Sequence, residues 1–103
     1  MIIVTGSVLA REGCAGRLLA LGLEHAASSR KASGCLNYVV FRDAENPLRL
    51  VFMEQWADRA TLIARFAAPA SREFVRAAAE LAEGAPRIRM YEAQEIQLQP
   101  GGA

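Results

Sequence analysis

Two apolar segments separated by a short polar break constrain the fold of this chain more than any other feature. Residues 35–42 and 48–56 are apolar runs of strand length, and the break between them carries Pro47. The second segment ends at Trp56, two residues before Asp58, which is a good N-cap for a following helix. The pattern predicts a β-hairpin that brings the only tryptophan of the chain to a strand–helix corner.

The composition narrows the class of protein. A chain of 103 residues makes one domain, and its hydrophobic content of 52% is slightly high, which indicates apolar surface that an oligomer would cover. The net charge is +1 without a basic block, so we expect no nucleic-acid partner. No apolar run reaches about 18 residues, so we expect no membrane-spanning helix. The N-terminal segment lacks the features of a signal peptide, and we expect a cytoplasmic protein.

Apolar periodicity predicts further elements on both sides of the hairpin. They are a strand over 2–10, a helix over 14–31, a pair of helices after Asp58 that is interrupted at 67–69, and a strand over 88–96. Gly34 ends the first helix, because glycine takes left-handed dihedral angles at little cost. Ser71 is an N-cap candidate for the second helix of the pair. We expect residues 97–103 to form a flexible tail, which leaves residues 1–96 as a single domain.

The order of these elements is typical of one fold class. Strand, helix, strand, strand, helix pair and strand make an α+β, ferredoxin-like split β-α-β fold, in which helices cover one face of an antiparallel sheet. Both faces of the strand over 48–56 carry apolar side chains, whereas a sheet wetted on one side would alternate more cleanly. We therefore expect the second face to be mostly apolar and covered by a second copy. The prediction is a homodimer that forms a dimeric α+β barrel.

Several short motifs give the chain a family resemblance. They are Gly34-Cys35-Leu36 with Tyr38, the break from Asp43 to Pro47, Glu54-Gln55-Trp56, the segment Ala70-Ser71-Arg72-Glu73-Phe74, and the opening strand with Gly13. In these motifs the chain resembles the antibiotic biosynthesis monooxygenase family of dimeric α+β barrels, over about residues 1–96. Members of that family include cofactor-free oxygenases of polycyclic phenols, quinol oxygenases, heme-degrading enzymes and isomerases of small signalling molecules. The resemblance implies a pocket between the sheet and its helices, lined by the tryptophan and by residues of the next helix.

Three positions depart from patterns of that family. The helix after the tryptophan carries Arg65, where many members have a histidine. Phe52 stands where the phenol-oxidising members often have an asparagine. The first strand reads Thr5-Gly6-Ser7 where the heme-degrading members have an asparagine. The first-strand sequence argues against heme degradation. Phe52 argues against the route of oxygenation that depends on an asparagine at that position.

Four side chains are candidates for catalysis, and each has a structural alternative. Trp56 offers a wall and an N–H donor to an aromatic substrate, or it closes the core between sheet and helix. Glu54 lies on the same strand face among apolar groups that would make it a proton acceptor, or it pairs with Arg65 or Arg89. Arg65 stabilises a bound anion if it faces the pocket, and is ordinary surface otherwise. His25, the only histidine, is either a general base or a residue on the helix surface.

Four further side chains are expected around the substrate, namely Phe52, Phe66, Tyr38 and Leu62. Leu62 and Phe66 belong to the inner stripe of the helix that follows Trp56. Tyr38 either donates its hydroxyl into a cavity or is a strand residue with a wet tip. No metal-ligand or phosphate-loop pattern is present in the sequence, so we expect neither a metal nor an organic cofactor.

Two functions follow from these features. The first is a cofactor-independent monooxygenase, in which dioxygen as co-substrate reacts with the anion of a small aromatic phenol or quinol that Glu54 or His25 has deprotonated. The alternative is a dimeric α+β barrel protein that isomerises or binds a small carbonyl metabolite without dioxygen. A gain of oxygen in the product mass separates the two. A purely structural dimer would have no pocket large enough for a bicyclic ligand.

Overall fold

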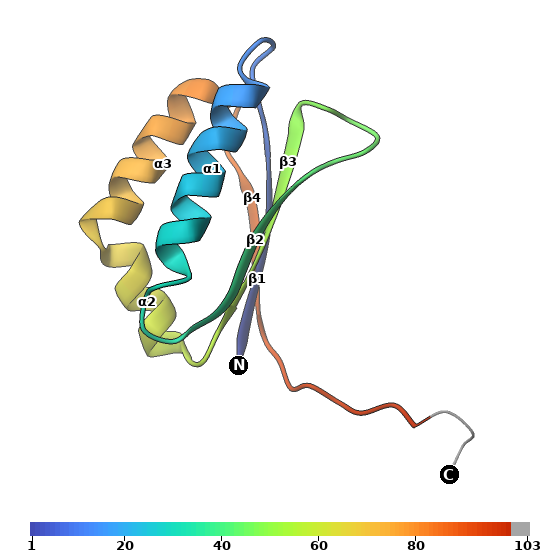
Figure 1. Cartoon of the computed structure of the whole chain (residues 1–103), viewed down its shortest axis with the longest axis vertical. Coiled ribbons are helices and arrows are strands. Elements are labelled where there is room, and N and C mark those ends of the chain that lie inside the picture. Colours follow the sequence, from blue (N-terminus) through green and yellow to red (C-terminus); the bar gives the residue numbers. More distant parts are fainter. Residues whose placement is uncertain (100–103) are drawn as a thin grey trace.

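The computed structural model describes residues 1–99 as a four-stranded antiparallel sheet with three helices (Figure 1). The elements are β1 (Ile2–Leu9), α1 (Ala15–Ser29), β2 (Cys35–Arg42), β3 (Arg49–Trp56), α2 (Arg59–Ala67), α3 (Pro69–Leu81) and β4 (Arg87–Glu92). The strands are arranged in the order β2-β3-β1-β4. This arrangement confirms the predicted α+β, ferredoxin-like fold.

The β2–β3 hairpin forms as the sequence predicts. In its loop, Asp43 and Asn46 each accept a backbone N–H two residues further on, which is the usual way that these side chains stabilise a turn. The register places Tyr38 opposite Glu54 on the neighbouring strand. Because side chains two residues apart share a face of a strand, Glu54 and Trp56 both point toward the helices, where both are buried.

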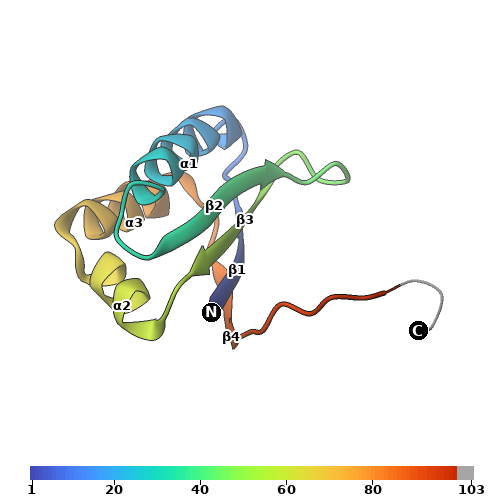
Figure 2. The ribbon, with the colours of Figure 1, turned by 60° about the horizontal axis from the view of Figure 1, so that its bottom comes forward.

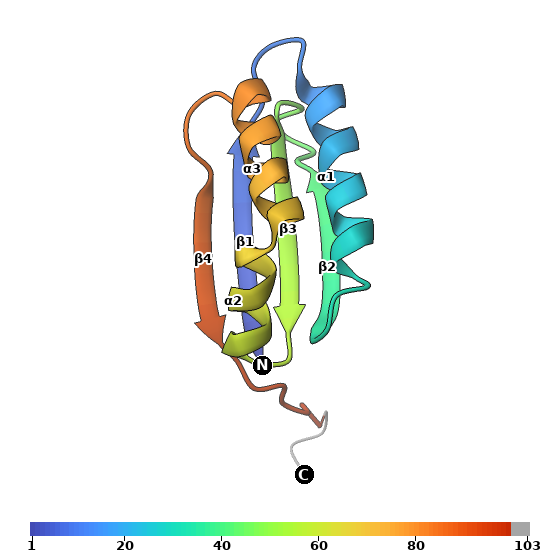
Figure 3. The ribbon, with the colours of Figure 1, turned by 90° about the vertical axis from the view of Figure 1, so that its left-hand side faces the viewer.

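The helices all lie on one side of the sheet (Figures 2 and 3). The N-cap predicted at Asp58 is confirmed, because its carboxylate accepts the backbone N–H of Thr61 at 2.8 Å. The N-cap predicted at Ser71 is wrong, because α3 begins earlier, at Pro69, and has Ala68 in the cap position. Proline suits the first turn of a helix, where its fixed φ is already helical and its missing N–H has no partner to lose.

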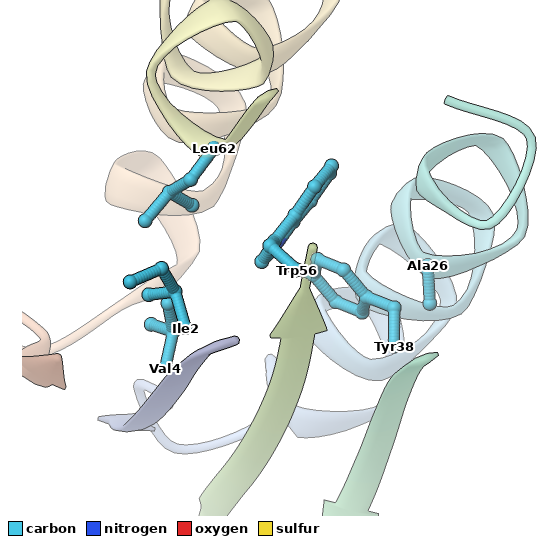
Figure 4. Packing of buried hydrophobic residues seen from close by; sticks show 6 residues of the cluster. All are labelled: Ile2, Val4, Ala26, Tyr38, Trp56 and Leu62. Atoms are coloured by element: carbon cyan, nitrogen blue, oxygen red, sulfur yellow. The ribbon is translucent and has the colours of Figure 1, made fainter. Parts of the chain in front are cut away.

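The hydrophobic core lies between the helices and the sheet in two clusters. One, near α2, consists of Ile2, Val4, Ala26, Tyr38, Trp56 and Leu62 (Figure 4). The other, toward the opposite end of the sheet, consists of Ala10, Leu18, Leu50 and Leu81.

The second face of the sheet carries no helix and is less apolar than expected. Strand alternation and register place on it the apolar Ile3, Leu9, Val39, Phe41, Val51, Met53 and Tyr91, together with the polar Thr5, Ser7, Asn37, Arg49, Gln55, Arg87 and Arg89. The prediction of a mostly apolar face is therefore wrong, because all four strands contribute polar side chains to it. Phe41 and Met53 still expose 53% and 37% of their surface in the single chain.

The fourth strand is shorter than predicted. It ends at Glu92 rather than Ile96, because its pairing with β1 ends at Ile2, and the last hydrogen bonds, just beyond the strand, join Ala93 and Met1 in both directions. Residues 93–99 then leave the sheet in an extended path (Figure 1). The predicted flexible tail lies partly outside the described residues, at 100–103. Within residues 1–99, no helix is long and apolar enough to cross a bilayer.

Candidate functional site

A buried carboxylate lies at the centre of the helix-covered face. Glu54 on β3 is 3% exposed, and one of its oxygens, Oε1, accepts a hydrogen bond of 2.9 Å from the indole Nε1–H of Trp56. An ionisable group is buried in a core only at a free-energy cost, which hydrogen bonds of this kind reduce. The ion pair considered for Glu54 does not form among the described residues: Arg89 belongs to the opposite sheet face, and Arg65 bonds elsewhere.

Burial raises the pKa of Glu54 above its ordinary value of 4.5. Three contacts stabilise the charged form of Glu54 and so oppose this rise in pKa. In decreasing order of their effect, they are the hydrogen bond from Trp56, the positive charge of Arg65 and the hydroxyl of Tyr38. A carboxylate whose pKa is raised in this way is a stronger base than an exposed glutamate.

Tyr38 lies directly across the hairpin from this carboxylate. It is 5% exposed, and burial together with the charge of Glu54 raises the pKa of its hydroxyl well above the usual value. Tyr38 is therefore a neutral hydrogen-bond donor beside Glu54 throughout the physiological pH range. Its neighbour Asn37 points to the other face of the sheet, as strand alternation requires.

His25 is packed between aromatic rings rather than exposed on the helix surface. Its imidazole stacks on Phe74 of α3 with ring centroids 4.0 Å apart, and meets the edge of Tyr38 at 5.6 Å. Burial and the nearby charge of Arg65 lower the pKa of His25 to about 4. The imidazole is therefore neutral at physiological pH.

Arg65 connects α2 to the end of α1. Its Nε lies 3.2 Å from the hydroxyl of Ser29, and one terminal nitrogen lies 3.2 Å from the hydroxyl of Ser28 and 3.4 Å from Nδ1 of His25. A guanidinium group only donates, so Nδ1 of His25 accepts and its proton resides on Nε2. The side chain that replaces the familiar histidine thus faces the polar cluster, and Glu54 and Tyr38 both experience its charge.

Five of the sequence candidates therefore belong to one cluster: the catalytic candidates Glu54, Trp56, His25 and Arg65, and the pocket candidate Tyr38 between them. The idea that the indole N–H serves a ligand does not fit this arrangement, because Glu54 already accepts that N–H and the ring is fully buried. Sequence reasoning missed Ser28 and Ser29. Nothing in a helix-terminal serine pair identifies a partner more than 30 residues away.

A groove opens beside the cluster, between α2 and β4. Its volume is about 250 Å³, and its lining consists of Ile2, Arg59, Leu62, Ile63, Met90, Tyr91 and Glu92. Arg59 and Glu92 form an exposed ion pair there. Of the predicted pocket residues, only Leu62 lines this groove. Figure 4 shows the indole of Trp56 between Leu62 and Ile2 on one side and Tyr38 on the other. Leu62 and Ile2 line the groove, so these two side chains and then the indole lie between the groove and Tyr38.

The two phenylalanines expected in the pocket lie elsewhere. Phe66 is 42% exposed on α2 and belongs to neither of the two core clusters. Phe52 is partly buried and packs on the core cluster around Trp56. A further polar group, the hydroxyl of Ser71 on α3, is buried without a hydrogen-bond partner among the described residues.

Comparison with solved structures gives close matches over nearly the whole chain. A protein of Deinococcus radiodurans, provisionally named an antibiotic biosynthesis monooxygenase, has 27% identity and a TM-score of 0.90, with 98% of this chain and 100% of that chain covered. Two matches below 25% identity support the fold alone. One is a conserved protein of unknown function from Bacteroides thetaiotaomicron, described as a possible oxidoreductase, with 23% identity and a TM-score of 0.84; 89% of this chain and 96% of that chain are covered. The other is a conserved protein from Methanosarcina mazei, with 22% identity and a TM-score of 0.85; 90% of this chain and 92% of that chain are covered.

Comparison with curated proteins gives no match. The sequence profile of the family described as antibiotic biosynthesis monooxygenase matches residues 1–77, three quarters of the chain, and these residues carry the whole polar cluster. The chain therefore belongs to the antibiotic biosynthesis monooxygenase family.

Proposed function

We propose that the protein is a cofactor-independent monooxygenase that acts on a small aromatic phenol or quinol. Family membership supports this class of reaction, and the observation that carries the proposal is the buried carboxylate of Glu54. A base of raised pKa, placed among aromatic rings and screened from water, suits proton removal from a weakly acidic aromatic substrate.

In the proposed reaction Glu54 accepts the substrate proton and the resulting anion transfers an electron to dioxygen. One oxygen atom then enters the ring as a carbonyl oxygen and the other leaves in water, so that a phenol and dioxygen give a quinone and water. The guanidinium of Arg65 favours the substrate anion and the reduced oxygen species, because it already acts on Glu54 and Tyr38 at this position. His25 is less suited to act as the base, since its pKa is about 4.

Access of the substrate to Glu54 requires a movement of Trp56 in this proposal. The groove residues Ile2 and Leu62 lie on one side of the indole, and Tyr38, which pairs with Glu54 across the hairpin, lies on the other. Turning the ring aside breaks its hydrogen bond to Glu54, which is the largest of the contacts that lower the pKa of that carboxyl. A substrate that displaces the indole therefore meets a stronger base than the empty protein contains.

We also propose that the protein is a cytoplasmic homodimer in which the helix-free sheet faces pack together. The apolar residues at the centre of that face, Val51 and Met53, support this packing. The guanidinium groups of the edge strand β4 would lie toward its margin, whereas the hydroxyls of Thr5 and Ser7 lie next to Met53 and Val51. Metal and flavin have no part in the proposed reaction.

A second function, isomerisation or binding of a small carbonyl metabolite, is favoured by one observation. Glu54 as base and Tyr38 as neutral donor are the two groups that proton transfer next to a carbonyl needs, and they lie across from each other on the hairpin. This function needs no dioxygen and leaves the substrate mass unchanged.

Incubation with a panel of phenols and quinols, with and without dioxygen, tests the proposal. We expect products that gain mass from isotopically labelled dioxygen. In Glu54→Gln the rate should fall about 100-fold or more, the usual contribution of a general base. Glu24→Gln is the matched control, since Glu24 is exposed on α1. Turnover that is equal without dioxygen contradicts oxygenation and supports the second function.

A further inference from the structure

The aromatic ring of Phe52 lies directly on the backbone of Gly6. These two residues are opposite each other on β3 and β1, and both lie on the helix-covered face. A Cβ atom added to Gly6 would overlap the far edge of the ring and approach its Cε1 to 2.9 Å. Glycine at this position is what allows the ring to cross from β3 over β1.

This ring fills the space between sheet and helices next to the groove. From the groove inward, β1 presents Ile2, then the fully buried Val4, and then Gly6 beneath Phe52. Phe52 packs on the same cluster as Val4 and Trp56. A ligand that enters from the groove and displaces the indole would therefore meet the Phe52 ring as its end wall.

The groove itself does not limit the ligand to one ring. It holds about 250 Å³, and a closed apolar cavity of about 150 Å³ is known to bind benzene. The limit arises further in, because Phe52 packs on the cluster of Val4 and Trp56, and a second ring extending past the indole would need the space that Phe52 occupies.

We propose that Phe52 sets the size limit of the ligand, so that the site takes one-ring phenols or quinols and rejects fused-ring ones. The inference rests on the proposed function, because it uses the same entrance and the same carboxylate. It goes beyond that function in assigning the specificity to one residue and in naming the substrate class.

Binding of hydroquinone and of 1,4-dihydroxynaphthalene, measured anaerobically by calorimetry, tests the inference. We expect the unaltered protein to bind hydroquinone at least ten times more tightly than the two-ring probe. In Phe52→Ala the affinity for the two-ring probe should rise at least tenfold. Phe66→Ala, which removes an exposed ring of α2, should change neither affinity.

A second variant covers the case in which Phe52→Ala does not fold, as judged by circular dichroism. Phe52→Leu keeps an apolar side chain but withdraws the ring from Gly6, and it should give a smaller gain in the same direction. Equal affinity of the unaltered protein for both probes overturns the inference, and so does a folded Phe52 variant without the gain. If the unaltered protein binds neither probe, the proposed function fails and the inference fails with it. Hydroquinone binding without a gain in the variants overturns the size limit alone.

Discussion

At the residue scale, the pair of Glu54 and Trp56 is the most consequential contact in the molecule. A carboxylate that is 3% exposed has a raised pKa because water no longer solvates its charge, and the indole N–H at 2.9 Å recovers only part of that solvation. The same contact makes the only tryptophan of the chain a reporter of the state of the carboxyl.

The tryptophan emission should therefore titrate with Glu54. We expect a transition in emission whose midpoint lies above pH 4.5, since burial raises the pKa of Glu54 above that value. In Glu54→Gln the transition should disappear, and in His25→Gln it should persist, because His25 titrates separately at about 4. An unchanged transition in Glu54→Gln would show that another group causes it.

His25 should make the folded state lose stability in acid. Its folded pKa of about 4 lies below the ordinary value of 6.5, so its contribution to stability is complete above pH 6.5 and is lost as the pH falls toward 4. Glu54 acts in the opposite sense, because its raised pKa favours folding at low pH and this contribution is lost as the pH rises.

We expect His25→Gln to lose less stability than the unaltered protein between pH 7 and pH 4. Urea unfolding midpoints at the two pH values measure this difference. Equal acid losses in the two proteins would mean that the imidazole is not held neutral in the fold.

At the element scale, two glycine turns of similar backbone conformation differ in what surrounds them. Gly34 connects the end of α1 to β2 with φ at 81°, and a Cβ there would overlap the side chain of Thr61 on α2. Gly13, before α1, has the same φ and open space around it. The predicted role of Gly34 as the end of the helix is wrong, because α1 ends at Ser29 and has Arg30 in the cap position. Gly34 instead turns the chain into β2 and lets α2 approach that turn.

Alanine substitutions should separate these two effects. Gly13→Ala should destabilise the protein by about 1–2 kcal/mol, the usual cost of a left-handed conformation for a residue with a Cβ. Gly34→Ala should cost more, because the overlap with Thr61 adds to the same backbone cost. Free energies of unfolding in urea measure both. Equal losses would show that α2 moves aside without penalty.

At the scale of the whole molecule, the helices cover only one side of the sheet (Figure 2). The other side exposes Phe41 and Met53 among polar groups, and covering it would remove apolar surface from water at a gain of about 25 cal/mol per Å². This surface is the physical basis for the proposed dimer.

Light scattering should give the mass of two chains at micromolar concentration. Met53→Lys should reduce it to one chain, because a lysine at the centre of the face would lose its hydration on dimerisation. Val75→Lys is the control, since Val75 is 62% exposed on α3, on the opposite side of the molecule. A mass of one chain for the unaltered protein contradicts the proposed dimer.

Local signals in the sequence determined most of the fold. The apolar runs, the turn residues and Asp58 act within a few residues of themselves, so the hairpin and the start of α2 could be predicted from them. The same reasoning put Glu54 and Trp56 on one face, because strand alternation is itself local. It failed at the end of β4, which is set by the pairing with β1. It also failed at Ser71, because α3 begins at Pro69.

Only the tertiary structure decided what surrounds the candidate residues. The contacts of Arg65 with Ser29 and of His25 with Phe74 join helices that are far apart in the sequence. The position of Phe52 over Gly6 likewise depends on the pairing of β1 with β3. Side-chain environments of this kind arise from long-range packing, whereas propensity and periodicity describe only the neighbours along the chain. For that reason the candidate residues of the site could be predicted from the sequence, whereas the groove between α2 and β4 could not.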